Sequence, residues 1–580
     1  MTKDQIEKIR HSLSHLMAMA VMERFPQTKL GIGPTIDNGF YYDFDLPEKI
    51  TDDMLPNLER RMKQLIKKNI SFERVSSTAE EATKIVKGNP YKEELLAELI
   101  KEKKPITFYR SANFIDLCGG PHINSTNEID TQSFKLVSLA GAYWRGDEKR
   151  PQLQRIYGVA FSSKQELDEY LAMKEEAEKR EHRRLGQELE LFAFSDLVGP
   201  GLPLFLPNGT ILMNELATYL DELKGQYNYE PVDIPHIAKS DLYKKSGHWD
   251  KFKNDIFFVK GKSEEFVLKP MNCPHHVMIY SALPRSYRDL PVRLAETTKM
   301  YRDEQTGELM GLSRVRSITI DDTHIFCRAD QILNEAEGAF DIISKFNKTF
   351  GFPIKVELSV RDPKNHDKYL GGDSVWNKSE ATLKKLLTKH KVKYTVHEGE
   401  AAFYGPKIDF KATDSLGRSW QLSTIQLDFN LPDRFKLEYT DKDGKKSQPV
   451  MIHIAVAGSI ERFLSILIEH YGGAFPVWLS PVQVQIIPVG SDHIKPSEKL
   501  SEELRSAGLR VKVDSANETV GNKIRKAIKL KTPYMLVIGD KEAKSTKLHV
   551  RARGSKDVKT VSKSAWIKEV FAQIKSRSIN

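Results

Sequence analysis

The chain has 580 residues, which is too long for one ordinary domain, so three or four domains are expected. A net charge of +10 indicates a polyanionic partner. Three cysteines exclude a disulfide framework, and the absence of a transmembrane-length apolar run or a signal peptide favours a cytoplasmic protein without membrane contact.

A helix is predicted over residues 2–25. His11 and His15 are four positions apart in it, so both imidazoles lie on one face. The later segment DLCGGPH carries Cys118 and His122, and these four side chains could form a metal site or a polar hydrolytic pocket. The alternatives are a solvated helix face for the two histidines and a small core residue for Cys118.

Residues 163–190 alternate in charge and have few apolar positions, which is typical of a solvent-exposed connecting helix without chemistry of its own. A further helix is expected near 214–225. The stretch 296–327 predicts a strand, a loop and a returning strand, with Arg302 and Arg314 at the two ends of the loop. Planar guanidinium groups on such a hairpin suit a triphosphate, and a charged hairpin facing solvent is the alternative.

Three separate segments each offer a thiol or an imidazole. Cys273 precedes the hairpin, His324 follows its loop, and His453 lies far downstream. One cysteine and two histidines make a plausible zinc site with an open fourth position. Scattered residues of these types are usually unrelated, so spacing alone favours three unrelated residues over a zinc site.

Strands alternate with helices in the central part, with hairpins among them, and this pattern favours a mixed antiparallel sheet over a Rossmann fold. One helix is expected from after Phe326 to about Phe350, and another is expected to end near Gly472. No phosphate-binding loop motif occurs at a strand–helix junction.

After Pro481 the pattern changes to a small α/β domain with helices near 497–507 and 522–529. Basic residues are expected to gather on its last hairpin, as an RNA contact requires: Lys541, Lys544, Lys547, Arg551 and Arg553. An ordinary edge hairpin protected by lysine is the alternative.

Several of these segments resemble motifs of the class II aminoacyl-tRNA synthetases. YNYEPVDIPHI resembles motif 1, which builds their dimer interface, Arg302-Asp-Glu304 resembles motif 2, and GSIERF with Arg462 resembles motif 3. MNCP, DDTHIFC and PVMIHIAVAGSIERF together resemble the threonyl-tRNA synthetase family, over a span from His11 to Arg551.

The resemblance implies an α+β multidomain chain with four parts. These are an α+β editing domain (1–162), a linker helix (163–190), a class II catalytic domain on a mixed antiparallel sheet (191–478) and an α/β anticodon-binding domain (479–580). The small N-terminal domain that precedes the editing domain in many members is expected to be missing.

The implied function is ATP-dependent attachment of L-threonine to tRNA(Thr) through threonyl-adenylate, with hydrolytic editing of seryl-tRNA. The expected cofactors are one zinc ion per subunit and Mg²⁺ with ATP, and the expected assembly is a homodimer. The alternative is a non-catalytic paralogue that binds RNA as a regulator, against which the retained motif residues argue. A stand-alone editing factor would need neither motif 2 nor motif 3.

The resemblance also implies residue roles. The catalytic groups would be Arg302, Lys407 and Arg462. ATP would further contact Glu304, Arg314, Gln421 and Thr424. Threonine would contact Asp322, Tyr404 and Gln426, and zinc would be held by Cys273, His324 and His453. The editing pocket, where metal is an open possibility, would contain His11, His15, Lys92, Tyr109, Asp116, Cys118 and His122. The anticodon would be read by Glu542 and Arg551.

Four positions depart from the family pattern. Ile318 stands where an aromatic residue usually stacks on adenine, Ile320 replaces a glutamine, His275 a glycine, and Ile454 an arginine. These departures bear on ATP affinity and on the positioning of substrate, and they leave the implied reaction class unchanged.

Overall fold

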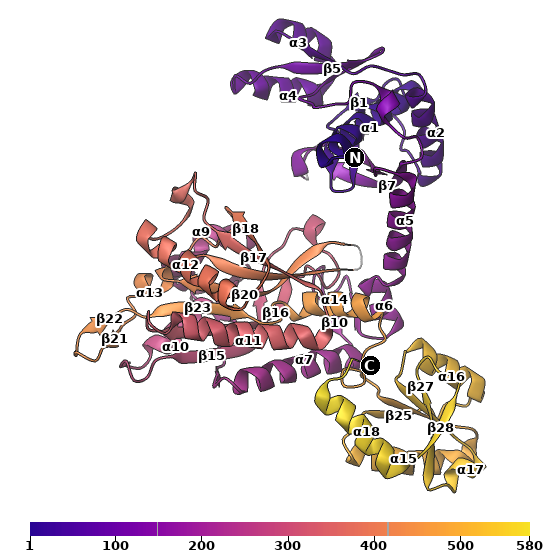
Figure 1. Cartoon of the computed structure of the whole chain (residues 1–580), viewed down its shortest axis with the longest axis vertical. Helices are drawn as coiled ribbons and strands as arrows, with labels where there is room; N and C mark the ends of the chain where they lie inside the picture. The colour runs from indigo at the N-terminus through magenta and orange to yellow at the C-terminus, as the bar shows by residue number, and fades with distance from the viewer. Residues whose placement is uncertain (148, 415–416, 580) are drawn as a thin grey trace. The chain divides into compact units, whose positions relative to one another are not determined.

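The computed structural model describes residues 1–147, 149–414 and 417–579. The chain divides into two compact units, Met1–Glu175 and Glu176–Asn580, and each is described by itself. Figure 1 shows the elements of both along the chain. Within the described residues, no helix is both long enough and apolar enough to cross a membrane.

The first unit is built around the predicted N-terminal helix, α1 (Lys3–Arg24). Thr2 caps this helix and forms a capping box with Gln5. Helix α1 packs on α2 (Leu55–Ile66) and on a sheet with strand order β1-β3-β8-β7, and every residue from Ser12 to Val21 is buried. The other elements of the unit are β1 (Lys29–Leu30), β2 (Thr35–Ile36), β3 (Gly39–Asp45), β4 (Glu73–Ser76), α3 (Ala79–Val86), α4 (Pro90–Lys101), β5 (Thr107–Ser111), β6 (Phe114–Leu117), β7 (Phe134–Tyr143) and β8 (Gln152–Ala160).

The second unit contains an eight-stranded sheet in the order β11-β15-β16-β23-β20-β19-β17-β18. All neighbours are antiparallel except the two outermost pairs, which confirms the predicted mixed antiparallel sheet. The strands in that order are β11 (Glu230–Pro231), β15 (Val292–Tyr301), β16 (Ser317–Cys327), β23 (Val450–Ala455), β20 (Ser419–Asp428), β19 (Lys407–Thr413), β17 (Ile354–Val360) and β18 (Tyr394–Glu398). The predicted hairpin over 296–327 is β15 paired with β16.

The register of this sheet aligns four polar residues from four strands. Lys407 pairs with Gln426, Gln426 with His453, and His453 with His324. Directly paired residues share a face of a sheet, so these four side chains form one row across it. Segments that are more than 120 residues apart in sequence, at His324 and His453, therefore become immediate neighbours.

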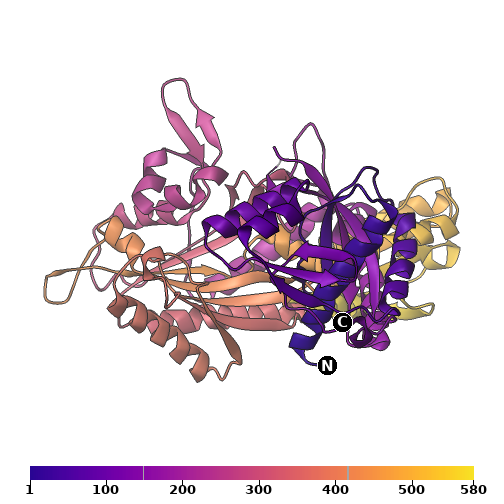
Figure 2. The same ribbon diagram turned by 90° about the horizontal axis from the view of Figure 1, so that it is seen from above.

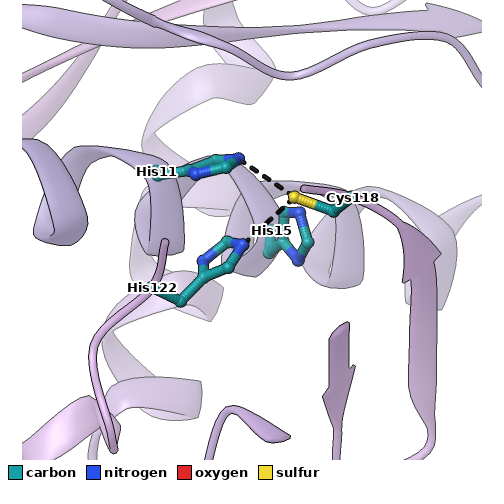
Figure 3. Close-up of side chains that lie close together, drawn as sticks. All are labelled: His11, His15, Cys118 and His122. Atoms are coloured by element: carbon teal, nitrogen blue, oxygen red, sulfur yellow. Dashed lines mark hydrogen bonds between the residues drawn. The ribbon is translucent and has the colours of Figure 1, made fainter. Parts of the chain in front are cut away.

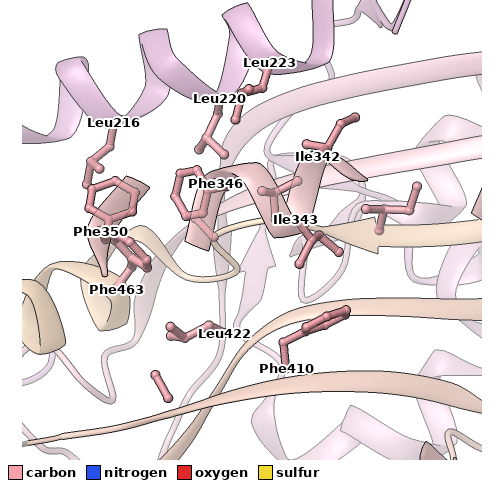
Figure 4. Close-up of a cluster of buried hydrophobic side chains, with 14 of the residues drawn as sticks. Leu216, Leu220, Leu223, Ile342, Ile343, Phe346, Phe350, Phe410, Leu422 and Phe463 are labelled. Carbon is pink, nitrogen blue, oxygen red and sulfur yellow. The ribbon is translucent and has the colours of Figure 1, made fainter. Parts of the chain in front are cut away.

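Helices α11 (Ile332–Phe350), α12 (Asp373–Lys389) and α14 (Ile460–Tyr471) pack on the opposite face of the sheet, and α7 (Pro207–Gly225) packs against α11 and α14. Figure 4 shows leucines of α7 and phenylalanines of α11 meeting Phe463 of α14 above sheet residues such as Phe410. Phe346 is fully buried in this core, and its ring centroid lies 5.1 Å from that of Phe463. Helix α14 ends where Gly472 adopts a left-handed conformation, as predicted.

A smaller sheet, β12-β14-β13, lies between the predicted motif 1 and motif 2 segments, and its hairpin β13–β14 extends away from the large sheet (Figure 2). Two helices after β12 and one after β14 complete this part. The elements are β12 (Ile237–Ala238), α8 (Ser240–Ser246), α9 (His248–Phe252), β13 (Phe258–Lys260), β14 (Glu265–Leu268) and α10 (Cys273–Ser281). Helices α9 and α10 bring His248, Phe252 and Cys273 to the polar face of the large sheet.

The prediction of a single exposed helix over 163–190 is wrong. The segment forms α5 (Lys164–Lys179) and α6 (His182–Glu188), and Glu181 caps the second helix by accepting hydrogen bonds from two backbone N–H groups. His182 and Leu185 are buried, because α6 packs against α14. The charge pattern concealed this burial, since only one narrow face of α6 is covered.

The C-terminal part is an α/β layer with the sheet order β25-β24-β26-β27-β28. The strands and helices predicted for this part are present, and its last helix, α18, was not predicted. In the central part, helix α7 begins earlier than expected. The elements are β24 (Val484–Pro488), α15 (Ile494–Ser506), β25 (Val511–Val513), α16 (Val520–Lys529), β26 (Tyr534–Ile538), α17 (Asp540–Ala543), β27 (Lys547–Ala552), β28 (Val558–Ser562) and α18 (Lys563–Ser576).

The substitution Phe346→Ala tests the core beneath the row of polar residues. It removes a fully buried ring and leaves a cavity, so the stability of the second unit should fall by about 3–5 kcal/mol. Denaturant unfolding followed by tryptophan fluorescence measures the loss. Leu283→Ala is the control, because that side chain is 60% exposed and its removal should change stability by less than about 0.5 kcal/mol. Equal effects of the two substitutions would contradict this placement of the core.

Candidate active sites

The four residues of the first predicted cluster meet in the structure (Figure 3). His11 and His15 come from α1, and Cys118 and His122 from the turn after β6. The Cys118 Sγ atom lies 3.3 Å from His11 Nε2 and 3.4 Å from His122 Nε2. One ligand atom from each of the four residues lies within 4.8 Å of the others, so the set could hold a metal ion.

The turn that carries Cys118 and His122 is fixed by local contacts. Gly120 has a left-handed φ of +71°, and a Cβ atom there would lie 2.4 Å from the hydroxyl of Tyr109. The Pro121 carbonyl lies 3.1 Å from His11 Nδ1. A carbonyl only accepts, so Nδ1 carries the proton and Nε2 presents a lone pair toward Cys118.

A buried ionic group borders this cluster. Lys92 Nζ lies 2.6 Å from one oxygen of Asp116, and Tyr42 donates a 2.5 Å hydrogen bond to the other. His15 Nε2 lies 3.7 Å from the same carboxylate. Lys92 and Asp116 were predicted and Tyr42 was not, although it stands in the aromatic-rich stretch GFYYDFD that the sequence displays.

Burial sets the protonation states of the first cluster. It lowers the pKa of His11, His15 and His122, and it raises the pKa of Cys118 to about 11. The imidazoles are therefore neutral and the thiol is protonated at neutral pH. His11, His15 and Cys118 line a cavity of about 430 Å³, which has room for a small ester and a water molecule.

The second cluster lies in the other unit, on the polar row of the large sheet. His324 Nε2 and His453 Nδ1 are 3.0 Å apart, and Cys273 at the start of α10 completes a set of ligand atoms within 4.8 Å of one another. All three residues are buried. The structure therefore brings together the three residues predicted to bind zinc.

The outer nitrogens of these histidines are already engaged. His453 Nε2 lies 2.9 Å from Asp428 Oδ2, and His324 Nδ1 lies 2.8 Å from His276 Nδ1. Their inner nitrogens remain directed at each other and at the thiol. Histidine ligands of zinc commonly have such outer partners, which fix the orientation of the ring, so the donor set fits this metal.

Three neighbours of the second cluster were not predicted. Asp428 and His276 are two of them, and His248 is the third, with Nε2 3.4 Å from Cys273 Sγ. His276 follows Cys273 in the run CPHH and could have been selected on that ground. Asp428 gave no sequence signal, because only the pairing of β20 with β23 brings it to His453.

A chain of hydrogen bonds continues from the second cluster along β20 and β19. Tyr404 stacks on the His453 ring and donates a 2.5 Å hydrogen bond to Gln426. Gln426 donates to Thr424, and Thr424 donates to Asp409. The Lys407 ammonium lies 2.7 Å from the same carboxylate. Four predicted residues are thus joined through Asp409, which sequence reasoning missed.

Asp322 lies on the same face of β16 as His324, two residues before it. Its carboxylate accepts a 3.1 Å hydrogen bond from the amide of Asn272, and burial raises its pKa. Gln421 lies beyond a bulge on β20, opposite Lys411. Unlike Thr424 on the same strand, Gln421 makes no described side-chain contact with the hydrogen-bond chain of β19 and β20.

Three arginines gather next to this chain. Arg302 is packed under the ring of Phe252, and its Nε has no hydrogen-bond partner among the described residues. Burial lowers the pKa of the Arg462 guanidinium, and the nearby charges of Arg302 and Arg314 lower it further. Arg314 is paired with Glu304. A buried donor without a partner and a surplus of positive charge indicate an anionic ligand.

In the C-terminal part, Glu542 lines a cavity of about 460 Å³ together with several lysines. The expectation that all five basic residues lie on the last hairpin is wrong. Lys541 belongs to α17 and Lys544 follows it, while Arg553 is turned inward and donates to two backbone carbonyls. Arg551 lies on β27 and donates to the Ser555 carbonyl.

Three family models match the chain. Residues 256–471 match the "tRNA synthetase class II core domain (G, H, P, S and T)", residues 483–573 the "Anticodon binding domain", and residues 106–157 the "Threonyl and Alanyl tRNA synthetase second additional domain". The first model covers the second cluster, and the third covers the Cys118 turn.

Similar proteins include threonine–tRNA ligases of Thermotoga petrophila (46% identical, 99% of this chain and 89% of the relative) and Deinococcus radiodurans (48%, 99% and 90%). Among solved structures, the RNA binding domain of a threonyl-tRNA synthetase from Cryptosporidium parvum is 36% identical with a TM-score of 0.64, covering 69% of this chain and 99% of that one. A putative threonyl-tRNA synthetase from Aeropyrum pernix is 28% identical with a TM-score of 0.59, covering 69% and 97%.

These similarities extend over nearly the whole chain and over both clusters, and they support a ligase rather than a non-catalytic paralogue. The second unit has the class II core with its three neighbouring arginines, and the first unit has the editing-type domain with its polar cavity. The chain therefore belongs to the threonyl-tRNA synthetase family, the threonine–tRNA ligases with a class II catalytic core and an editing domain.

Proposed function

We propose that the second cluster selects L-threonine and joins it to ATP before transfer to tRNA(Thr), and that the first cluster hydrolyses seryl-tRNA. One observation carries this proposal: the sheet register aligns Lys407, Gln426, His453 and His324 in one row, next to Cys273. A single face of the sheet thereby offers candidate metal ligands, a hydrogen-bonding amide and a cation to one small substrate.

Cys273, His324 and His453 would hold one zinc ion per subunit. When bound, zinc would supply an open position for the amine and the hydroxyl of threonine. Asp428 and His276 would keep the two imidazoles in the ligating orientation by holding their outer nitrogens. Asp322, Tyr404 and Gln426 would surround the amino acid.

In the activation step the threonine carboxylate attacks the α-phosphate of ATP, and pyrophosphate leaves. Negative charge develops on the phosphates, so fixed cations aimed at them lower the barrier. Arg302 and Lys407 would face the α-phosphate and the carboxylate, while Arg462 would stack on adenine and reach the γ-phosphate. Mg²⁺ would accompany ATP. The adenine amine and the phosphates would also contact Glu304, Arg314, Gln421 and Thr424.

In the editing step a water molecule attacks the seryl ester. Burial lowers the pKa of His11, His15 and His122, so these imidazoles are neutral and can orient this water through hydrogen bonds. Lys92 and Asp116 would anchor the seryl group, together with Tyr109 and Cys118. The cavity of about 430 Å³ supports a small substrate rather than a bulky one.

The other proposals concern the whole protein. Its domains would span 1–162, 163–190, 191–478 and 479–580, and Glu542 and Arg551 would contact the anticodon. We further propose a homodimer built through the motif 1 segment around β11, and a cytoplasmic location. The C-terminal cavity lined by lysines supports an RNA contact in that part of the chain.

Replacing Cys273 tests the metal site. Cys273→Ser should reduce the zinc content from about one ion per chain to near zero and lower threonine-dependent pyrophosphate exchange by roughly 100-fold or more, since second-sphere changes alone cost 10- to 100-fold. Elemental analysis and isotope exchange measure the two effects. The matched control is Cys327→Ala, a buried cysteine outside the cluster, which should keep its zinc. Unchanged activation after complete metal removal would contradict the zinc site.

Competing amino acids test how threonine is selected. Valine has no hydroxyl and would leave the metal under-coordinated, so it should be rejected far more strongly than shape alone allows, which is roughly 100-fold. Serine keeps the hydroxyl and lacks one methyl group, worth about 1–3 kcal/mol, so it should be activated slowly but measurably. Pyrophosphate exchange with the three amino acids side by side provides the comparison. Valine activated as readily as serine would refute selection by metal.

The double substitution His11→Ala, His15→Ala tests the editing pocket. It removes two of the three imidazoles, so seryl-tRNA should accumulate during aminoacylation with serine, and its hydrolysis should slow by about 100-fold or more. Deacylation of purified seryl-tRNA measures the loss. Pyrophosphate exchange with threonine serves as the control and should match the parent, since the substituted residues belong to the other unit. Deacylation at the parental rate would show that the pocket lies elsewhere.

A further inference from the structure

The buried residue His182, at the start of α6, contacts the segments that carry two of the proposed ATP-binding arginines. It lies seven residues after the end of the first unit, in the segment 163–190 whose charge pattern is typical of a connecting helix. Its exposed fraction is 1%. A histidine buried this completely in a connecting segment requires a specific reason, because both ring nitrogens must be satisfied there.

The first contact of His182 is with α14. Its Nδ1 lies 2.8 Å from the carboxylate of Glu469, and its backbone N–H donates to the same oxygen. Glu469 is also buried and lies seven residues, or two helical turns, after Arg462. The two residues therefore lie on the same side of α14.

The second contact is with the loop between β15 and β16. The backbone N–H of Leu312 donates to His182 Nε2 over 3.1 Å. An N–H group can only donate, so Nε2 is the acceptor and Nδ1 carries the proton that is donated to Glu469. The adjacent Gly311 has a φ of +49°, and a Cβ atom there would lie 2.3 Å from His182 Nε2. The loop is thus shaped to approach this imidazole closely.

The same loop also forms hydrogen bonds with Arg462 and its helix. The Ser313 carbonyl, one residue after Leu312, accepts a 3.0 Å hydrogen bond from Arg462 Nε, and the Ser313 hydroxyl meets Ser465 of α14 at 2.8 Å. The next residue, Arg314, pairs with Glu304. Two proposed ATP ligands are therefore oriented by the stretch of loop that His182 holds.

The pair His182 and Glu469, with Glu181, also has the composition of a small metal site, and their ligand atoms lie within 4.8 Å of one another. Both imidazole nitrogens are used in hydrogen bonds, one as donor and one as acceptor, so His182 has no lone pair left for a metal ion. Its two hydrogen bonds instead join the β15–β16 loop to α14.

We propose that His182 is a positioning residue of the ATP site, which holds the β15–β16 loop against α14 so that Arg462 and Arg314 face the nucleotide. This inference rests on the proposed roles of those two arginines. It makes the connecting segment a part of the scaffold of the nucleotide site, separate from the threonine pocket.

Three substitutions at His182 test the proposal in pyrophosphate exchange. His182→Ala should raise the KM for ATP about tenfold and the KM for threonine less than about twofold, as expected for the loss of roughly one effective hydrogen bond. His182→Gln places an acceptor near the position of Nε2 and should recover much of the ATP affinity. His182→Asn keeps only a donor near the position of Nδ1 and should behave like His182→Ala.

The matched control is Leu189→Ala, which opens a cavity next to α6 and leaves the hydrogen bonds of His182 intact. It should lower the unfolding temperature without changing the KM for ATP. An unchanged KM for ATP in His182→Ala, or equal increases for ATP and threonine, would overturn the proposal. Arg462→Ala tests the proposed role of Arg462 separately from that of His182. An unchanged KM for ATP in that variant would refute the role of Arg462 itself.

Discussion

The register of the eight-stranded sheet is the constraint on which the central part of the protein depends. Lys407, Gln426, His453 and His324 are paired in succession across four strands. The alternating positions of the same strands are apolar and pack under the helices. A slip of one residue would move the polar row into the core and the apolar row into the site. Burial of one face therefore fixes the chemistry of the other.

The two candidate sites differ in the charge of their side chains. In the first unit, burial keeps His11, His15 and His122 neutral, so they can hydrogen-bond a water molecule without adding charge to the site. In the second unit, Arg302 and Arg462 are half-buried with their charges close together, and desolvation lowers the pKa of both. Such an arrangement is costly without an anion and becomes favourable when a polyphosphate binds.

The positions that depart from the family pattern are accommodated in different ways. Ile454 follows His453 on β23, so it points to the helix-covered face and joins the apolar core. Ile318 and Ile320 lie on the face that carries Asp322, because residues two apart along a strand share a face, and they pack with Met300 in a small apolar cluster. The first departure extends the core beneath the sheet, while the other two form an apolar patch on its polar face.

The sequence by itself determined the elements that depend on local periodicity, such as α1, the β15–β16 hairpin and the end of α14 at Gly472, and its family resemblance grouped Cys273, His324 and His453 as candidate metal ligands. It missed Asp409, Asp428 and Tyr42, and it misjudged the exposure of α6. These residues act through partners that are distant in the chain. Only the tertiary structure decided them, because hydrogen-bond partners and burial follow from how strands and helices pair across long sequence separations, which local periodicity does not encode.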